Sequence, residues 1–367
     1  MLGRMRWPGR VACALAYTTT ALCTAGCGST PDVADKGCED GATGPGGVVG
    51  FDATTGETRW STPIGLPDGA AVFGDTLVVS SGPHVRGISV STGDVSWCVE
   101  LAPRDVGLGS GVVAAGRYAV AISGPDVVAF DPASGEERWR RDIADSLARL
   151  RGRDDVVWVF DGTAVGNTIA ALDSLTGEDA LSPGDPPKLP SMFGGSLTTT
   201  GDFELNAGVV PATNRQETSL TVSSKGAVLW TAIVPGFEAG FAGSSEQPAV
   251  LVIDQTGGTG APGPMHAGMV DSRLTAYSAA SGERLWQVPL PGAPHVIAPI
   301  SDDVAVVPVG TELHAIDVAT GATRWTAGQP SPGRGGEYSL DGTVWFVAPG
   351  SGTTAVAVGF AEQPYRD

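Results

Sequence analysis

One hairpin-like motif recurs seven times along this 367-residue chain, and it limits the possible folds more than any other feature. In each copy an apolar, alternating run leads into a short polar turn that ends in Gly. The turn glycines are Gly56, Gly93, Gly135, Gly177, Gly226, Gly282 and Gly321. Six copies place a Trp four residues further on, at Trp60, Trp97, Trp139, Trp230, Trp286 and Trp325. The fourth copy has Leu181 at that position, so the aromatic is common to the others.

The spacing of these glycines, 37 to 56 residues, is near the length of a four-stranded propeller blade. Each copy is typical of a β-hairpin, because a tight turn that needs positive φ favours Gly. The Trp at the end of the second strand offers a large apolar surface for packing against a neighbouring sheet. Leucine-rich repeats are shorter than this spacing. Tetratricopeptide and ankyrin repeats are helical, whereas these segments alternate apolar and polar residues as strands do.

A second recurring element, a polar turn followed by a β-rich run, lies upstream of the hairpins. Gly74–Val79 and Asp302–Val307 are two examples. With a further short strand, each unit has four antiparallel strands. The first hairpin begins near Gly47, whereas the runs Val344–Val347 and Thr354–Val358 follow the last one. We therefore expect an all-β propeller over residues 47–367, closed when C-terminal strands complete the N-terminal blade. It has seven blades, or eight if the C-terminus supplies one strand more.

Composition supports this fold class. The 53 Gly and 27 Pro residues make up about 22% of the chain, too many turn formers for a helical protein. The formal net charge of −18 repels phosphate backbones, so we expect no nucleic-acid partner. It also argues against a polybasic contact with anionic lipid.

The N-terminus has the features of an export signal. Three arginines precede the short apolar run Val11–Cys23, and Ala25-Gly26-Cys27 follows. Small residues before a Cys resemble the lipobox of bacterial lipoproteins, in which that sulfur receives diacylglycerol. We therefore predict a signal peptide at 1–26, a lipidated Cys27 and a tether over 27–46. The alternatives are an ordinary cleaved signal and a plain apolar N-terminus.

Two cysteines would remain in the exported chain besides Cys27. In an oxidising compartment the pair Cys38 and Cys98 favours a disulfide that would pin the tether to the first sheet. The alternative is two buried free thiols, since the sequence does not give the separation that a disulfide requires.

The pattern A-x-D-x-x-T-G-x-x-x-W resembles the quinoprotein-type, or PQQ-like, β-propeller repeat over residues 47 to 360. Among lipid-anchored relatives the chain is similar to the barrel-assembly propeller lipoprotein of Gram-negative outer membranes. That resemblance implies a scaffold and not an enzyme. Quinone-dependent dehydrogenases of the family hold their cofactor beneath a disulfide of adjacent cysteines, which this chain lacks. We therefore expect no catalytic residues, no cofactor and no metal.

Other chemical motifs are weak. Residues 258–263 match G-x-G-x-x-G, but Pro262 and Pro264 oppose the helix that a phosphate site needs. The histidines at 84, 266, 295 and 314 have no metal-ligand spacing, and His314 is interpreted as a packing residue. The acidic pairs Asp154-Asp155 and Asp302-Asp303 fall at repeat turns.

The two longest repeat intervals contain Ser182–Gly201 and Gly257–Asp271, which we interpret as surface insertions that either bind a partner or have no role. The function expected is a non-catalytic scaffold or ligand-sensing module. It would be held by lipid at the extracytoplasmic face of a cell membrane and would contact envelope or extracellular proteins. The alternative is a divergent quinone-dependent oxidoreductase, or a hydrolase, that uses the central channel.

Overall fold

The computed structural model describes residues 46–65, 67–102, 111–143, 148–153, 155–160, 168–180, 195–209, 217–236, 238–256, 271–292, 294, 296–309, 312–328, 344–350 and 353–360. Every regular element in these ranges is a β-strand. Within them no helix is long and apolar enough to span a bilayer. The prediction of an all-β chain is confirmed.

The strands form seven sheets, and all strand pairs are antiparallel. The first sheet unites both ends of the described chain and contains β1 (Gly46–Asp52), β2 (Thr58–Pro63), β26 (Val344–Pro349) and β27 (Thr354–Phe360). The second contains β3 (Pro67–Phe73), β4 (Thr76–Ser81), β5 (His84–Ser89) and β6 (Val95–Glu100). The third contains β7 (Val113–Ala115), β8 (Tyr118–Ser123), β9 (Asp126–Phe130) and β10 (Glu137–Asp142).

The remaining four sheets follow in chain order. The fourth contains β11 (Arg149–Arg153), β12 (Val156–Phe160) and β13 (Thr168–Asp173). The fifth contains β14 (Gly195–Thr200), β15 (Phe203–Val209), β16 (Glu217–Ser224) and β17 (Ala227–Pro235). The sixth contains β18 (Glu238–Ala242), β19 (Ala249–Thr256), β20 (Asp271–Ser278) and β21 (Arg284–Leu290). The seventh contains β22 (Ala298–Ser301), β23 (Val304–Val309), β24 (Glu312–Asp317) and β25 (Thr323–Gly328).

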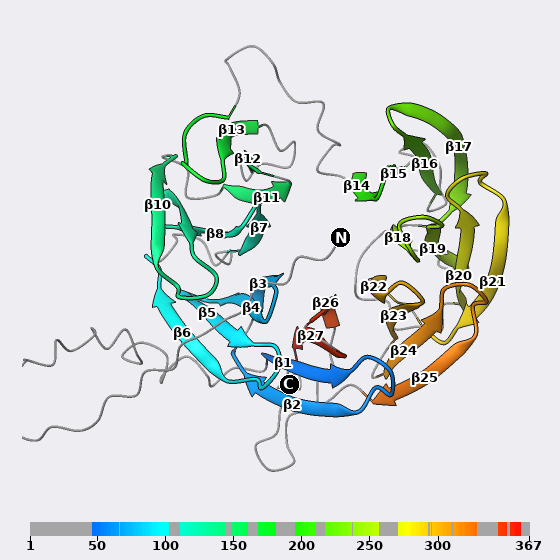
Figure 1. Ribbon diagram of the computed structural model, residues 1–367, viewed down its shortest axis with the longest axis horizontal. Helices are drawn as coiled ribbons and strands as arrows, with labels where there is room; N and C mark the ends of the chain where they lie inside the picture. The colour runs from blue at the N-terminus through cyan, green and yellow to red at the C-terminus, as the bar shows by residue number, and fades with distance from the viewer. Residues whose placement is uncertain are drawn as a thin grey trace, which may run out of the picture. The chain divides into compact units, whose positions relative to one another are not determined.

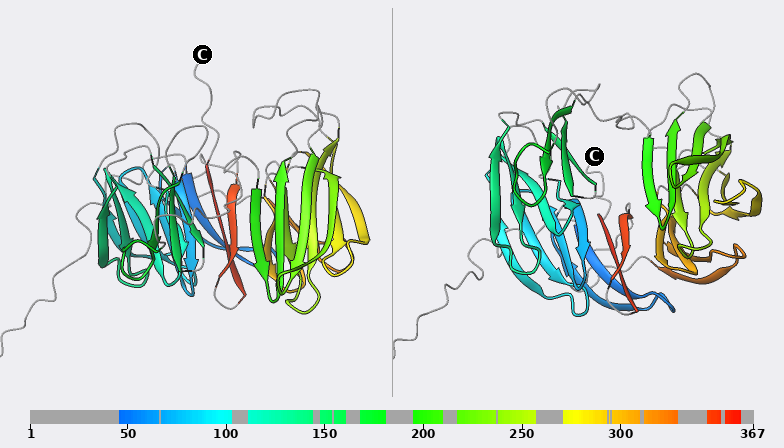
Figure 2. Two further views of the ribbon diagram at one scale, coloured as in Figure 1. Left: turned by 90° about the horizontal axis from the view of Figure 1, so that it is seen from above. Right: turned by 45° about the horizontal axis from the view of Figure 1, so that its top comes forward.

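The described sheets are arranged about a common centre (Figure 1). The first strand of each repeat, such as β18 or β22, lies toward that centre, and the last, such as β21 or β25, lies on the outside. The strands lie roughly along one common axis and alternate in direction, so the turns gather on two opposite sides (Figure 2). The prediction of four-stranded antiparallel units holds for six sheets. The fourth has three strands among the described residues, plus an isolated bridge between Leu172 and Asp179.

Both ends of the described chain lie in one sheet. Strand β1 pairs with β27 from Gly46 opposite Phe360 to Asp52 opposite Thr354. Each strand thereby covers an edge that the other would leave exposed.

Six clusters of buried apolar side chains join neighbouring sheets. The cluster that includes Val48, Leu77 and Ile88, for example, joins the first sheet to the second. Alternation produces these clusters, because successive side chains of a strand between two sheets reach opposite neighbours. Among the described residues no such cluster joins the fourth sheet to the fifth.

A tryptophan also links the two sheets at each of these six boundaries. Its indole Nε1–H donates a hydrogen bond of 2.7 to 3.1 Å to a backbone carbonyl of the neighbouring sheet's turn. The donor and acceptor residues are Trp60 and Val90, Trp97 and Pro132, Trp139 and Ser174, Trp230 and Ala279, Trp286 and Val318, and Trp325 and Ala53. The ring covers the turn glycine of that neighbour. The repeated Trp and Gly thus meet across sheets, within a distance that leaves no room for a side chain on the glycine.

The fifth repeat departs from this pattern. Its turn is a two-residue hairpin in which Lys225 and Gly226 both have positive φ, 51° and 79°. That combination is the type I′ turn. Gly226 is exposed and has nothing within 4 Å of the position of a Cβ atom. The sequence accounts for this, because the preceding repeat has Leu181, which lies outside the described residues, in place of Trp.

One sequence interpretation needs correction. Residues Ser182–Gly201 were expected to form a surface insertion, but their end, Gly195–Thr200, is strand β14 of the fifth sheet. Thr198 to Thr200 pair with residues of β15, so this segment completes a repeat unit. The signal peptide, most of the tether and residues 257–270 lie outside the described residues. The boundaries at 26 and 46 therefore stay predictions.

Candidate functional site

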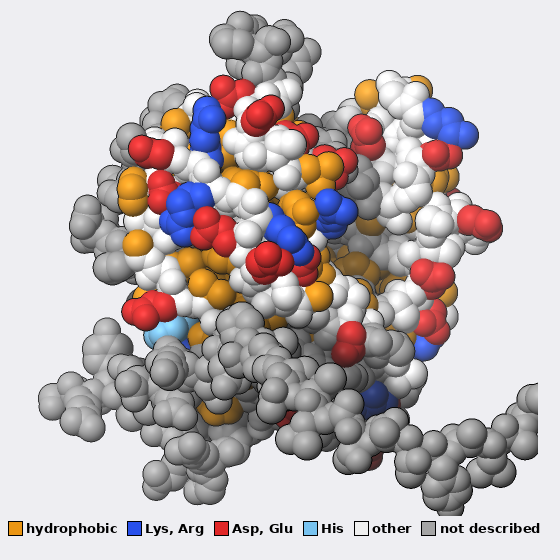
Figure 3. All heavy atoms as spheres, turned by 60° about the vertical axis from the view of Figure 1, so that its left-hand side comes forward, with side chains coloured by type: hydrophobic (Ala, Val, Ile, Leu, Met, Phe, Trp, Pro, Cys, Tyr) orange, Lys and Arg blue, Asp and Glu red, His pale blue; other side chains and the backbone are white. Residues whose placement is uncertain are grey.

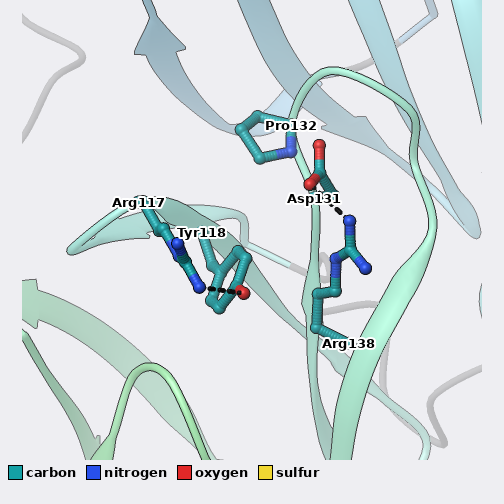
Figure 4. Close-up of a pocket in the computed structure, with 5 residues that line it drawn as sticks. All are labelled: Arg117, Tyr118, Asp131, Pro132 and Arg138. Carbon is teal, nitrogen blue, oxygen red and sulfur yellow. Dashed lines mark hydrogen bonds and ion pairs between the residues drawn. The ribbon is translucent and has the colours of Figure 1, made fainter.

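A shallow cavity of about 330 Å³ lies at the turns of the third sheet. It is lined by Arg117, Tyr118, Asp131, Pro132 and Arg138 (Figure 4). Arg117 lies in the turn that precedes β8, and Tyr118 is the first residue of β8. Asp131 and Pro132 lie in the turn between β9 and β10, and Arg138 lies in β10. The repeat therefore brings two of its recurring turns together at this point.

The charged groups of the cavity are largely engaged with one another. The guanidinium of Arg117 lies 5.0 Å from the centre of the Tyr118 ring and donates a hydrogen bond of 3.0 Å to its hydroxyl. Arg138 donates to Asp131 at 2.7 Å and forms an ion pair with Glu136 at 3.1 Å. Arg117 has no carboxylate partner among the described residues.

The electrostatics of the cavity do not favour proton transfer near neutral pH. The hydrogen bond from Arg138 holds the pKa of Asp131 below its usual value, and the same contact raises the pKa of Arg138. An efficient general base has a pKa near the operating pH, whereas this carboxylate is stabilised in its charged form. We interpret the cavity as part of the turn structure.

The Asp131–Arg138 contact is one of several equivalent Asp–Arg ion pairs in the repeat turns, which were not predicted from the sequence. Asp52 binds Arg59 and Asp317 binds Arg324, each pair seven residues apart. The other oxygen of each Asp accepts backbone N–H groups of the turn, as Asp317 does from Thr320 at 2.9 Å. A common spacing of seven between Asp and Arg is the sequence signal that could have revealed these pairs.

The outer surface near this cavity carries both signs of charge. Figure 3 shows basic and acidic side chains interspersed on the side of the molecule that includes β10. Arg140 of β10 bridges Asp126 at 2.9 Å and Glu137 at 2.7 Å. Exposed pairs of this kind contribute little stability individually, but they leave no large region of a single sign.

Most other predicted candidates lie apart from one another. His314 is in β24, buried, with its Nε2 atom 3.1 Å from Glu312, as expected of a packing residue. Asp303 lies in a turn and binds Arg324 at 2.7 Å, in agreement with its interpretation as a turn residue. His84 is in β5. His266, His295, Asp154 and the G-x-G-x-x-G segment lie outside the described residues.

The predicted modification sites have no structural test. Cys27 and Cys38 lie outside the described residues, and Cys98 lies half-buried in β6. Lipidation of Cys27 and the disulfide between Cys38 and Cys98 therefore stay predictions.

The described residues do not fit a quinone and calcium site. No group of three or more His, Cys, Asp or Glu side chains in the described ranges could hold a metal ion. None of the five cysteines of the chain is adjacent to another. We therefore assign no residue to a redox cofactor.

One acidic side chain is unusual for its position. Glu238, at the start of the innermost strand β18, is half-buried, and this burial raises its pKa to about 7. Because the folded state binds this proton more tightly than the unfolded state, stability falls as the pH rises from about 4.5 to about 7.

We expect Glu238→Gln to stabilise the protein above pH 7 by roughly 1–3 kcal/mol and to leave it nearly unchanged at pH 4. Denaturant unfolding across this pH range would measure the effect. The matched control is Glu283→Gln at an exposed turn, which should alter neither value. Equal pH dependence in Glu238→Gln and the unmodified chain would contradict the burial of the charge.

The family model described as "Outer membrane protein assembly factor BamB" matches residues 81–232 and 267–360, about two thirds of the chain. No curated protein matches the chain closely enough to count as a relative. These two results leave the family, and not a single relative, as the basis of comparison.

Similar solved structures include BamB from Moraxella catarrhalis, with 14% identity over 86% of this chain and 92% of that one, and a TM-score of 0.44. Quinohemoprotein alcohol dehydrogenase from Comamonas testosteroni has 13% identity over 89% and 78%, with a TM-score of 0.44. The Pan2 WD40 domain from Neurospora crassa has 10% identity over 82% and 90%, also with a TM-score of 0.44. Such distant likenesses say nothing about activity. The extent of the family match, together with the repeated Trp and Gly contacts, shows that this chain belongs to the PQQ-like β-propeller family of the outer membrane protein assembly factor BamB.

Proposed function

We propose that this chain is a non-catalytic, protein-binding propeller of seven blades, held by a lipid on Cys27 at the extracytoplasmic face of a membrane. The seven sheets support the number of blades. The pairing of β1 with β27 supports closure, because one sheet is built from both ends of the described chain. The description of the family, an outer membrane protein assembly factor, supports a role in binding other proteins at a membrane.

The observation that carries the binding role is an apolar surface on the outer strand of the fifth sheet. Val228 and Ile233 of β17 are 62% and 63% exposed, and Leu229 beside them is 43% exposed. Apolar side chains that gather on a surface mark contact sites for other proteins. The outer strands β2, β10 and β25, in contrast, carry arginines that form ion pairs.

Crosslinking on intact cells followed by mass spectrometry tests the proposal. Lysines occur at 36, 188 and 225, and Lys225 lies in the turn that leads into β17. We expect an amine-reactive reagent to join Lys225 to other envelope proteins. Cys27→Ala should reduce those products, because the chain would leave the membrane. An absence of protein crosslinks at all three lysines would contradict a binding role.

The enzymatic alternative has a direct test. Addition of pyrroloquinoline quinone and calcium to the purified protein should leave its absorbance spectrum and melting temperature unchanged. A ligand that binds the folded state would raise the melting temperature, so an increase would contradict the non-catalytic proposal.

A further inference from the structure

Strand β17 differs from every other outer strand that the structure describes. It is nine residues long, Ala227–Pro235, and none of its residues is charged. The outer strands of the other four-stranded sheets each contain at least one charged residue: Arg59 in β2, Glu100 in β6, Arg138 in β10, Arg284 in β21 and Arg324 in β25. Natural proteins protect sheet edges from unwanted pairing with charges and short strands. β17 lacks both of these protections.

The edge of β17 is open within the described part of the chain. The strand is last in its sheet and pairs only with β16 there. In an antiparallel pair the backbone N–H and C=O groups of an outer strand point alternately toward its partner and away from it. Those that point away from β16 can receive another strand.

The exposed side chains of β17 lie on one side of the sheet. Ile233 is opposite Ser219 and Val228 is opposite Ser223, whereas Trp230 and Val234 reach the cluster shared with the sixth sheet. The free side therefore combines apolar side chains of β17 with small hydroxyl side chains of β16. An added strand could extend this uncharged surface without burying a charge.

We propose that β17 pairs with an extended segment of a partner protein, which becomes a fifth strand of this sheet. This proposal rests on the proposed function and names its mode of binding. Main-chain hydrogen bonds along the edge provide affinity in such complexes, and alternate side chains provide specificity. Val228 and Ile233 would contact β-branched or aromatic side chains of the partner.

The charges around β17 define the partner further. Glu204 of β15 and Glu217 at the start of β16 have no cationic partner among the described residues. The nearby Lys225 is engaged by Asp202 at 3.1 Å. With a net charge of −18, the chain favours a segment that carries Lys or Arg beside its apolar core. A second copy of the chain would bring the same carboxylates to the interface and is disfavoured.

A labelled peptide provides the probe. Its core has about eight alternating Thr and Val residues, lies between pairs of lysines, and resembles the strand that we expect to be added. We expect fluorescence anisotropy to show saturable binding to the full chain. Ile233→Lys and Ile233→Glu should each weaken it at least about tenfold, because both place a charge in the new strand pair. Tighter binding to Ile233→Glu would instead reveal simple charge attraction and would overturn the proposal.

Two controls distinguish strand addition from non-specific binding of the peptide to the protein surface. Leu285→Lys changes a side chain of similar exposure, 51%, on the outer strand β21, which already contains Arg284. It should alter the affinity by less than about twofold. A peptide with every core amide N-methylated keeps its side chains but loses its hydrogen-bond donors, and it should not bind. Equal binding of the methylated peptide would overturn the proposal.

Two further measurements show whether a negative result contradicts strand addition or the binding role itself. Sedimentation velocity should show that the chain without peptide is monomeric; a dimer that Ile233→Lys dissociates would make a second copy the occupant and overturn the proposal. If the intact-cell crosslinks persist in Ile233→Lys while the peptide fails to bind, strand addition is wrong but the binding role stands. If the unmodified chain yields no crosslinks, the binding role itself fails.

Discussion

Replacement of Trp97 by Ala should lower the free energy of unfolding by about 3–5 kcal/mol. The indole is 5% exposed and packs in the cluster between the second and third sheets. Its Nε1–H donates to the Pro132 carbonyl at 2.8 Å, and its ring covers Gly135. The substitution therefore leaves a cavity between two sheets and removes the hydrogen bond to that carbonyl.

The substitution Trp97→Phe separates the two contributions. Phe retains most of the apolar packing but cannot donate to Pro132, so we expect a loss of about 1–2 kcal/mol. Denaturant unfolding followed by the remaining tryptophan fluorescence would measure both variants. A loss below about 1 kcal/mol for Trp97→Ala would show that the packing of these sheets does not depend on the indole.

Replacement of Gly135 by Ala should be destabilising by about 2–4 kcal/mol, for two physical reasons. Its φ of 71° is in the left-handed region, where a side chain costs about 1–2 kcal/mol. A Cβ atom would also lie 2.5 Å from Cε3 of Trp97, too close for any real contact. The ring would have to move out of the cluster that it fills.

Gly226 is the matched control for this prediction. Its φ of 79° is almost the same, but no atom lies within 4 Å of the position of its Cβ. Gly226→Ala should therefore cost only the conformational term, about 1–2 kcal/mol. Equal losses in the two variants, measured by denaturant unfolding, would contradict a role of the ring contact. The difference between them isolates the contact between sheets.

Much of the fold is predictable because the signals are local. The alternation in Leu313–Asp317 and the turn closed by Gly321 indicate a hairpin without reference to any other part of the chain. The same reasoning was incomplete at β14, because its Gly and Ser residues are not typical of a strand. That strand depends on pairing with β15.

The candidate site was less predictable. The Asp–Arg contacts of the turns have a regular spacing in the sequence, but the cavity at Arg117 and Tyr118 depends on how two turns meet. The partial burial of Glu238, which raises its pKa, has no local signal in the sequence. The partner-binding role predicted for the long insertions stays a prediction, because most of their residues lie outside the described ranges. The exposed side chains of Val228 and Ile233 lie on a regular strand, where no insertion marks them in the sequence.

By itself the sequence determined the repeat, the hairpins, the turn glycines and the Trp four residues after six of those glycines, because these follow from alternation and turn chemistry over a few residues. Only the tertiary structure decided which sheets Trp97 and its counterparts join, the register in which β1 pairs with β27, and that the edge of β17 is open within the described residues. The physical reason is that burial and edge exposure depend on segments far apart in the chain. The sequence lists those segments but does not place them beside one another.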